Sequence, residues 1–516
     1  MLILMVFAGC TSQKEATANA SPSTATTETI ASDTAANGTM FTDRDKEIGY
    51  SEAESTTITL NNDASVSSGN GVTVKNNTVT ISSEGTYILS GSLSNGQIVV
   101  DAADDAKIQI VLNGVDISNE STSAIYVKNA DKVFLTTASN TENTVSVTGE
   151  YVAIDDNNID AVIFAKSDLT LNGAGTLTIS SKYGHGVVSK DDLAVTSGTY
   201  AITAASNGLS GKNSVRIADG TFAITAGKDG IHSENTDDTT IGFVYIEGGT
   251  INIIAEKQGI QGTTDVSILG GTIDITKSYE GIEGLTINIS GGDVSLVASD
   301  DGLNAAGGND GSGGTPQASM SAVDGCLINI SGGKLTVDAK GDGIDSNGGL
   351  TISGGVITVS GPTENMDGTI DYNGTATITG GTLLGAGSSG MVQGFSDSST
   401  QGSILYVLTS SQQAGTAVTL KDASGKVIAQ LTPAKQFQSV NLSVPELASG
   451  ATYTLTVGST DYTIAMTATT FSNSTGAMGG GQGGGQKPQG GIGGAYGVPP
   501  QGGMGTDATS SATVQQ

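Results

Sequence analysis

The stretch EGIEGLTINISGGDVSLVASDDGL (Glu280–Leu303) contains one period of a repeat that fills the middle of the chain. Apolar and polar residues alternate on both sides of a Gly-Gly pair, and this period of two is typical of strands with one face in a core. The residues expected to face inward are Leu285, Ile287, Ile289, Val294, Leu296 and Ala298. The stretch therefore predicts short strands that bury one face.

The same arrangement recurs along the chain, with a polar residue, a glycine and an apolar residue about every 22 residues. Two longer intervals are explained by insertions at residues 232–242 and 307–325. At about 3.3 Å per residue, 22 residues make a coil of about 70 Å, enough for three short strands and their turns. The period is too short for a propeller blade and has no helical half, which excludes a leucine-rich horseshoe. We therefore predict an all-β chain built on a right-handed parallel β-helix.

The composition agrees with this prediction. The 516 residues include 75 glycines, only 14% are charged, and no amphipathic helical pattern extends beyond two turns. The formal net charge of −30 excludes ordinary binding to nucleic-acid phosphates, because such a chain cannot replace their counterions. It favours extracellular solubility or an affinity for cations.

Five regions can be delimited from the sequence. Residues 1–10 end in FAGC, which resembles a bacterial lipoprotein signal with Cys10 as the lipid attachment site; a chance cysteine in a truncated N-terminus is the alternative. The regions that follow are a disordered tether at 11–54, the β-helix at 55–398, a β-rich cap or subdomain at 399–475, and a Gly/Gln/Pro-rich low-complexity tail at 476–516. This organisation predicts a location at the extracellular face of the bacterial membrane or at the cell surface, with membrane contact only through the lipid.

The second cysteine is predicted to be structural. Cys326 precedes Ile328 and Ile330 at a period of two, and the corresponding position one unit earlier is Leu285. We therefore expect Cys326 to be a small buried apolar residue and not a reactive thiol.

Stacked coils convert positions of the repeat into columns of neighbouring side chains, and two of these columns are acidic. The column before the repeated glycine contains Glu280, Asp301 and Asp342. A second column, two residues after that glycine, contains Glu283, Asn304 and Asp345, with Asp300 beside both. Like charges about 5 Å apart repel by about 0.8 kcal/mol in water and about 3 kcal/mol at an effective dielectric constant near 20.

A divalent cation would convert this repulsion into stabilisation, and carboxylate and amide oxygens suit Ca²⁺ and not zinc. The candidate calcium ligands are Glu280, Glu283, Asp300, Asp301, Asn304, Asp342 and Asp345. The alternative is that Asp-Gly only forms turns, because glycine tolerates a positive φ and Asp bonds its own backbone.

No catalytic residue can be assigned. His185 and His232 lack metal-ligand spacing and are expected to be exposed turn residues. A calcium-dependent lyase would need a cationic base near the acids. Lys257, Lys277 and Lys340 precede the acidic positions, but an exposed lysine beside acids usually only balances charge.

The motifs SYEGIEGLTINISGG (residues 278–292), ASDDGLNAAGGNDGSGG (298–314) and GDGIDSNGGLTISGG (341–355) resemble a bacterial carbohydrate-binding β-helix family first described from a cellulose-degrading clostridium. The resemblance implies a right-handed parallel β-helix, bound calcium and binding to cellulose or acidic sugars. It also implies a structural likeness to calcium-dependent pectate lyases without an established lyase activity. This chain departs from the family pattern at His185, which stands where an acid is usual.

Together these observations predict a surface-tethered protein that binds acidic plant or microbial polysaccharides, with calcium bridging protein and sugar carboxylates. The absence of Trp and an aromatic content of 4% argue against flat binding to crystalline cellulose, which uses aromatic platforms. Two alternatives remain open, a calcium-dependent polysaccharide lyase and a structural adhesin or surface spacer.

Overall fold

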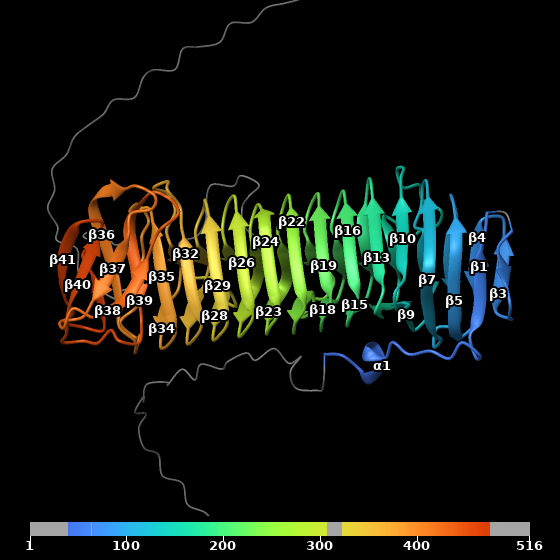
Figure 1. Ribbon diagram of the computed structural model, residues 1–516, viewed down its shortest axis with the longest axis horizontal. Coiled ribbons are helices and arrows are strands. Elements are labelled where there is room, and N and C mark those ends of the chain that lie inside the picture. The colour runs from blue at the N-terminus through green and yellow to red at the C-terminus, as the bar shows by residue number, and fades with distance from the viewer. Residues whose placement is uncertain (1–39, 63, 307–321, 475–516) are drawn as a thin grey trace, which may run out of the picture. The chain divides into compact units, whose positions relative to one another are not determined.

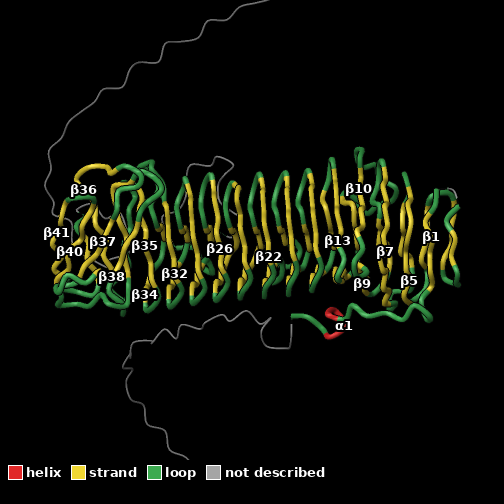
Figure 2. Tube along the Cα trace, viewed as in Figure 1, coloured by secondary structure: helices red, strands yellow, loops and turns green. Residues whose placement is uncertain are grey.

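The computed structural model describes residues 40–62, 64–306 and 322–474. These residues form an all-β fold with a β-solenoid of about 11 turns and a small antiparallel sheet (Figures 1 and 2). The helix within them is α1 (Asp43–Lys46), and no helix of the described chain is long and apolar enough to cross a membrane. The predicted all-β parallel β-helix is confirmed. Cys10 and the tail at 476–516 lie outside the described residues.

The chain divides into two compact units. The first extends to Thr225 and also includes Tyr245–Ile251, and the second comprises Ala226–Val244 and the chain from Asn252 onward. In each unit a coil contributes one strand to each of three parallel sheets, as the coil length predicts. Strands β19 (Thr221–Ala226), β21 (Phe243–Ile246) and β22 (Thr250–Ala255) lie where the units divide.

In the first unit, the first sheet contains β4 (Thr78–Ile81), β6 (Gln97–Asp101), β8 (Ile125–Asn129), β11 (Ala161–Ala165), β14 (His185–Ser189) and β17 (Leu209–Gly211). The second sheet contains β9 (Lys132–Thr137), β12 (Asp168–Gly173), β15 (Asp192–Val195) and β18 (Ser214–Ile217). The third contains β10 (Glu142–Val147), β13 (Thr176–Ser181) and β16 (Thr199–Ala204). The strands that begin the unit are β1 (Thr56–Leu60), β2 (Val66–Ser67), β3 (Val72–Lys75), β5 (Gly85–Leu93) and β7 (Lys107–Asn119). Strand β7 continues from the second sheet into the third.

In the second unit, the first sheet contains β20 (Ile231–Ser233), the first parts of β23 (Ile260–Ile268) and β25 (Ile282–Ile289), and then β27 (Leu303–Ala305), β30 (Ile344–Ser346) and β33 (Ile370–Tyr372). The second sheet contains the later parts of β23 and β25, with β28 (Leu327–Ile330), β31 (Gly349–Ile352) and β34 (Ala376–Ile378). The third contains β24 (Thr272–Ser278), β26 (Asp293–Ala298), β29 (Lys334–Ala339), β32 (Val356–Ser360) and β35 (Thr382–Gly387).

Antiparallel strands follow the last coil, as predicted. Strand β39 (Phe437–Ser443) pairs antiparallel with both β35 and β36 (Ser403–Gln412), and β42 (Thr470–Ser472) pairs with β36. A separate sheet has the order β38 (Val427–Leu431), β37 (Val418–Lys421), β40 (Thr452–Val457) and β41 (Thr460–Ala465).

The solenoid core consists of apolar ladders in which one residue stacks on its equivalent in the next coil. In the first sheet of the second unit, Ile282, Leu303, Ile344 and Ile370 follow one another in register, and all four are fully buried. Each such side chain stabilises the fold by about 1.5–3 kcal/mol relative to an exposed one. Cys326 is free and buried, as predicted, whereas Leu285 is only half-buried because it lies at the corner between the two parts of β25.

The repeated glycines allow the coils to approach one another closely. A Cβ on Gly302 would lie 2.4 Å from the carbonyl oxygen of Gly343, and one on Gly281 would lie 2.3 Å from that of Gly302. Neither glycine has a positive φ, unlike Gly292 and Gly333 at the other corner, with φ of 83° and 74°. Close packing between coils therefore explains the glycine of each Asp-Gly pair, and a left-handed turn does not.

The last part of the predicted tether is ordered. Residues 40–50, which we call the strap, include α1, and Asp45 is 2% exposed. Its carboxylate lies 2.8 Å from Lys132 Nζ and accepts a hydrogen bond of 2.6 Å from Thr170 Oγ1, while its carbonyl accepts one of 2.6 Å from Thr196 Oγ1. The strap is thus attached to β9, to β12 and to Thr196, the residue that follows β15.

Candidate functional site

The first acidic column forms as predicted. The amide of Gly281 donates to the carbonyl of Asp301 at 3.0 Å, and that of Gly302 donates to the carbonyl of Asp342 at 2.9 Å. The amide of Gly259 donates to the carbonyl of Glu280 in the same way, at 3.0 Å. Glu280, Asp301 and Asp342 therefore occupy one position in three successive coils.

The second column also forms, and it is longer than predicted. Glu283 is paired with Asn304, Asn304 with Asp345, and Asp345 with Asp371 on β33. Asp371 and the nearby Asp367 were missed because DGTID has one residue more than DGID before its isoleucine. This residue places Gly368, not Asp367, level with Asp342, since the Gly343 amide donates to the Gly368 carbonyl. The Ile-Asp that follows both Asp342-Gly343 and Asp367-Gly368 was the available signal.

The two glutamates are buried and bonded to amides from neighbouring coils. Glu280 and Glu283 are 0% and 1% exposed. Glu280 accepts hydrogen bonds from Asn304 Nδ2 at 3.0 Å and from Gln258 Nε2 at 3.3 Å, and Glu283 accepts one from Gln261 Nε2 at 3.1 Å. Glu280 and Glu283 therefore belong to a buried hydrogen-bond network within the protein.

The aspartates of the first column each accept a backbone hydrogen bond from the following coil. Asp301 Oδ1 accepts from the amide of Asp342 at 2.6 Å, and Asp342 Oδ1 accepts from the amide of Gly368. One oxygen of each carboxylate therefore connects two coils. The structural role of these aspartates is a coil-to-coil hydrogen bond, which a neutral asparagine oxygen could also make.

The carboxylates are close enough to raise one another's pKa. Burial raises the pKa of Asp301 to about 8, with further contributions from Asp345 and Asp300. Burial and the charges of Asp301 and Asp345 raise the pKa of Asp342 to about 10. Burial followed by Asp371 and Asp300 raises the pKa of Asp345 to about 7. The pKa values of Asp367 and Asp371 are also raised, chiefly by burial.

One polar atom of the site accepts no hydrogen bond. Asn304 is 2% exposed, its Nδ2 donates to Glu280, and its Oδ1 is buried without a donor among the described residues. An unpaired buried carbonyl oxygen costs about 1–3 kcal/mol. It lies in the second column between Glu283 and Asp345.

Within the described ranges, no three His, Cys, Asp or Glu side chains are arranged so that they could share a metal ion. The carboxylates thus lie in two columns but do not converge on a point. Mutual repulsion favours such a separation of like charges. The prediction of calcium ligands is untested by this arrangement.

The histidines are half-buried, so the prediction of exposed turn residues is wrong. His232 Nδ1 lies 2.9 Å from Asp229 Oδ2, and His232 Nε2 lies 3.6 Å from Glu234 Oε2. Burial would lower the pKa of His232, but the two carboxylates outweigh it and raise this pKa to about 9. His185 Nε2 lies 3.7 Å from Asp160 Oδ2. Protonated His232 therefore balances the charge of Asp229 and Glu234.

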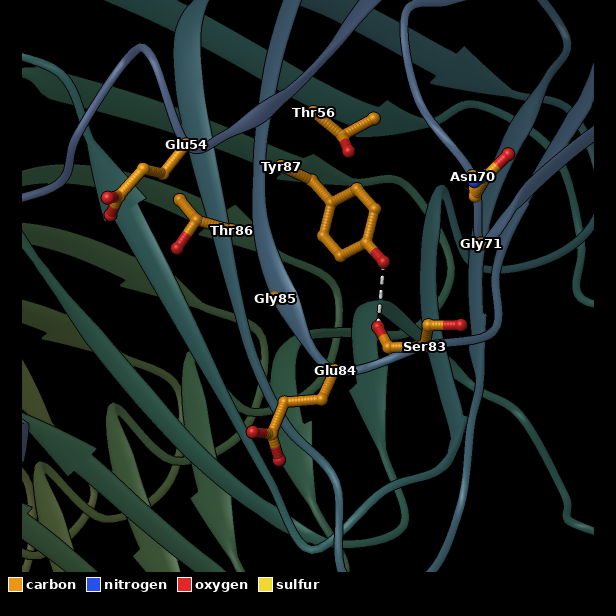
Figure 3. A pocket seen from close by; sticks show the side chains of 9 residues that line it. All are labelled: Glu54, Thr56, Asn70, Gly71, Ser83, Glu84, Gly85, Thr86 and Tyr87. Carbon is orange, nitrogen blue, oxygen red and sulfur yellow. Dashed lines mark hydrogen bonds between the residues drawn. The ribbon is translucent and has the colours of Figure 1, made fainter.

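A shallow pocket of about 320 Å³ lies near the start of the first unit, far along the chain from the acidic columns. Glu54, Glu84 and Tyr87 line it, and the Tyr87 hydroxyl donates to the carbonyl oxygen of Ser83 at 2.7 Å (Figure 3). It contains none of the predicted site residues. Its open, polar lining gives a ligand little apolar surface to bury.

Comparison with known proteins supports the carbohydrate-binding resemblance. Residues 75–325 match a family described as "Carbohydrate-binding domain-containing protein". A protein of the same description from Acetivibrio thermocellus is 34% identical over 136 residues, which are 26% of this chain and 48% of that relative. The chain thus spans about half the length of this curated relative.

A solved structure is also similar in sequence. It is described as the polysaccharide lyase-like protein from C. thermocellum, as a gadolinium derivative, and it is 32% identical. The match covers 48% of this chain and 96% of that one, with a TM-score of 0.40. The family match ends at residue 325, so the aspartates at 342, 345, 367 and 371 lie beyond it.

Proposed function

We propose that this protein binds acidic polysaccharides, and that calcium held at the acidic columns of the second unit takes part in the binding. The observation that carries the proposal is the in-register stacking of carboxylates on consecutive coils. The pKa values of Asp301, Asp342 and Asp345 are raised to about 8, 10 and 7, so keeping this cluster ionised at neutral pH requires a compensating cation. The family matched by residues 75–325 supports a carbohydrate as the ligand.

The donor set fits calcium in kind. Half-exposed carboxylates at Asp300, Asp301 and Asp345, together with the buried Oδ1 of Asn304, are hard oxygen donors. Asp367 and Asp371 extend the set by one coil. Glu280 and Glu283 already accept hydrogen bonds from amides, so we assign them to the support of Asn304 and its neighbours. Binding requires the aspartates to turn toward a shared ion.

Calcium at this site would supply positive charge and open coordination positions for the carboxylates of a uronate polymer. The protein residues then have two tasks. Asp301 and Asp342 keep the coils in register through backbone hydrogen bonds to one carboxylate oxygen each and contribute negative charge with the other. Asp300, Asn304 and Asp345 present oxygen atoms along the outer side of the stack. Retention of the protein at the cell surface through a lipid on Cys10 belongs to the same proposal, and the mass of the mature N-terminus tests it.

The test compares wild type with the double variant Asp301→Asn and Asp342→Asn. Asparagine retains an oxygen that can accept the backbone hydrogen bond, so the variant should fold. In wild type, free calcium at a hundred times its Kd should add about 2.7 kcal/mol to the free energy of unfolding, whereas the variant should gain little. Polygalacturonate should bind wild type in calcium and bind much more weakly in EDTA.

Asp293→Asn is the matched control, because Asp293 is an exposed acid of the same unit that pairs with Lys334. It should leave both the calcium effect and glycan binding unchanged. A wild-type melting temperature that is the same in calcium and in EDTA would rule out the calcium site. If polygalacturonate binds equally well in calcium and in EDTA, glycan binding does not depend on calcium.

A further inference from the structure

A second ladder of side chains runs beside the acidic columns, one residue earlier in each coil. The amide of Lys257 donates to the carbonyl of Lys228 at 3.2 Å, that of Tyr279 to the carbonyl of Lys257 at 2.7 Å, and that of Asp300 to the carbonyl of Tyr279 at 2.8 Å. Residues stacked in this way on parallel coils project to the same side of the solenoid. The order along the second unit is therefore two lysines, a tyrosine and then the aspartates.

The two lysines are exposed, and neither forms an ion pair with an acid in the part of the chain that the structure describes. Nearby lysines do form ion pairs: Lys277 with Glu256 at 2.6 Å and Lys334 with Asp293 at 3.1 Å. Two unpaired cations on adjacent coils, about 4.8 Å apart at the backbone, repel each other. Such an arrangement is unusual in a chain of net charge −30 with 51 acidic residues available, and it fits an anionic ligand.

Tyr279 adds an aromatic surface between the lysines and the acids. Its side chain is 36% exposed, although most large apolar and aromatic side chains of this unit are buried. Aromatic rings are the usual platforms for the apolar face of a sugar ring. The spacing between coils is close to the length of one sugar unit in an extended glycan chain, so successive coils can meet successive sugars.

We infer that a polyuronate chain binds along the axis of the coils, with its carboxylates paired to Lys228 and Lys257 and a sugar ring stacked on Tyr279. This inference rests on the proposed function, because it extends the glycan from the acidic columns toward β20 and β23. The lysines contact sugar carboxylates directly, and the neighbouring carboxylates near Asp300 are neutralised by calcium. The glycan chain is expected to run along the coil axis because all these residues lie on one side of the stacked coils.

The experiment measures binding of polygalacturonate in calcium, at low and high ionic strength. The double variant Lys228→Ala and Lys257→Ala should bind about tenfold more weakly than wild type at low salt, as expected for two exposed ion pairs. Its affinity should also fall less with salt, because fewer charges are paired. Tyr279→Ala should weaken binding by about fivefold, and Tyr279→Phe should retain the wild-type affinity.

Lys277→Ala is the matched control, since this exposed lysine is two residues from Tyr279 but pairs with Glu256. It should bind as wild type does, and the melting temperatures of the lysine variants should match that of wild type because these side chains are exposed. If wild type binds polygalacturonate and the double lysine variant binds equally well, the ladder is overturned and the proposed function stands. If wild type does not bind at all, both are overturned.

Discussion

Equivalent columns of the first sheet in each unit carry opposite chemistry. In the first unit the column contains Tyr126, Phe164 and Val188 in register, all buried, with Ile159 packed on them. In the second unit the equivalent positions include Glu283, Asn304, Asp345 and Asp371. The inward ladders are apolar in both units. The coil therefore fixes where a side chain lies, while the residue type at the outward position decides whether the surface is a second small core or a charged site.

The loop at Asp155–Asp160 shows how the first unit covers this column. Tyr126 donates to Asp155 Oδ2 at 2.7 Å, and Asn157 Nδ2 donates to the Tyr126 hydroxyl at 2.8 Å. Asp155 thus holds the loop against Tyr126. An acidic loop beside the first sheet is thus structural in one unit, whereas the acids of the other unit lie in the column itself.

The largest expected effect comes from removing the aromatic column. Phe164→Ala should lower the free energy of unfolding by about 3–5 kcal/mol, because Phe164 is fully buried and the space left cannot refill. Urea denaturation followed by circular dichroism measures this change. Thr358→Ala, on a half-buried position of β32, is the control and should change stability far less. A loss of unfolding free energy below about 1 kcal/mol would show that the aromatic column under this loop does not act as a core.

The second prediction concerns the stability that the acidic columns lose as the pH rises from acidic to neutral. In EDTA, wild type should lose at least about 3 kcal/mol of stability between pH 4 and pH 7 relative to the Asp301→Asn, Asp342→Asn variant. The sign follows from the raised pKa of Asp301, about 8: the folded form retains a proton that the unfolded chain releases near pH 3.8, so stability is present at low pH and lost as the pH rises. Urea titrations at each pH measure the difference. Parallel pH profiles for the two proteins would contradict the prediction.

The third prediction gives the first unit the opposite pH dependence. Burial alone would raise the pKa of Asp45, but hydrogen bonds from Lys132, Thr170 and Thr42 outweigh it and lower this pKa to about 2. Its stabilisation is therefore present above pH 3.8 and is lost as the pH falls toward 2. Asp45→Asn should cost about 2 kcal/mol at pH 7 and little at pH 2. Protease cleavage near residue 50 provides the readout, and equal cleavage of variant and wild type at pH 7 would contradict a docked strap.

The smallest expected effect concerns the exposed ion pairs of the second unit. Lys334→Ala removes a pair of 3.1 Å between two side chains that are more than half exposed. It should change the unfolding free energy by no more than about 0.5 kcal/mol, and even less in high salt. Thermal melts at two salt concentrations check this. A larger loss would mean that surface charge, and not the columns, controls the stability of this unit.

The repeat was predictable because its spacing is in the sequence. Alignment on the repeated glycine, with residues 307–325 treated as an insertion, places Asp301 over Asp342 and Asn304 over Asp345, and backbone pairing confirms both. Asp371 was not predictable from spacing alone, because a single inserted residue moves one acid out of the column and leaves the next one in it. The burial of Glu280 was missed because it depends on amides from other coils, such as Gln258.

The strap was beyond prediction for a different reason. Its helix has four residues and no periodic pattern, and its partners lie far along the chain: Arg216 Nη1 donates to the carbonyl of Met40 at 2.9 Å, and Arg44 lies 4.3 Å from the ring centre of Phe134. Contacts of this kind are determined by which side chains the coils place on one face. Local sequence gives no signal of them.

The strap also determines how the first unit responds to mechanical force. Tension applied to the chain before Met40 reaches the contacts with Arg216, Thr196, Thr170 and Lys132 before it reaches β1. These four side chains belong to four successive coils, so the load is divided among them in shear. The terminal strand β1 is thereby protected from being peeled off its neighbour one hydrogen bond at a time.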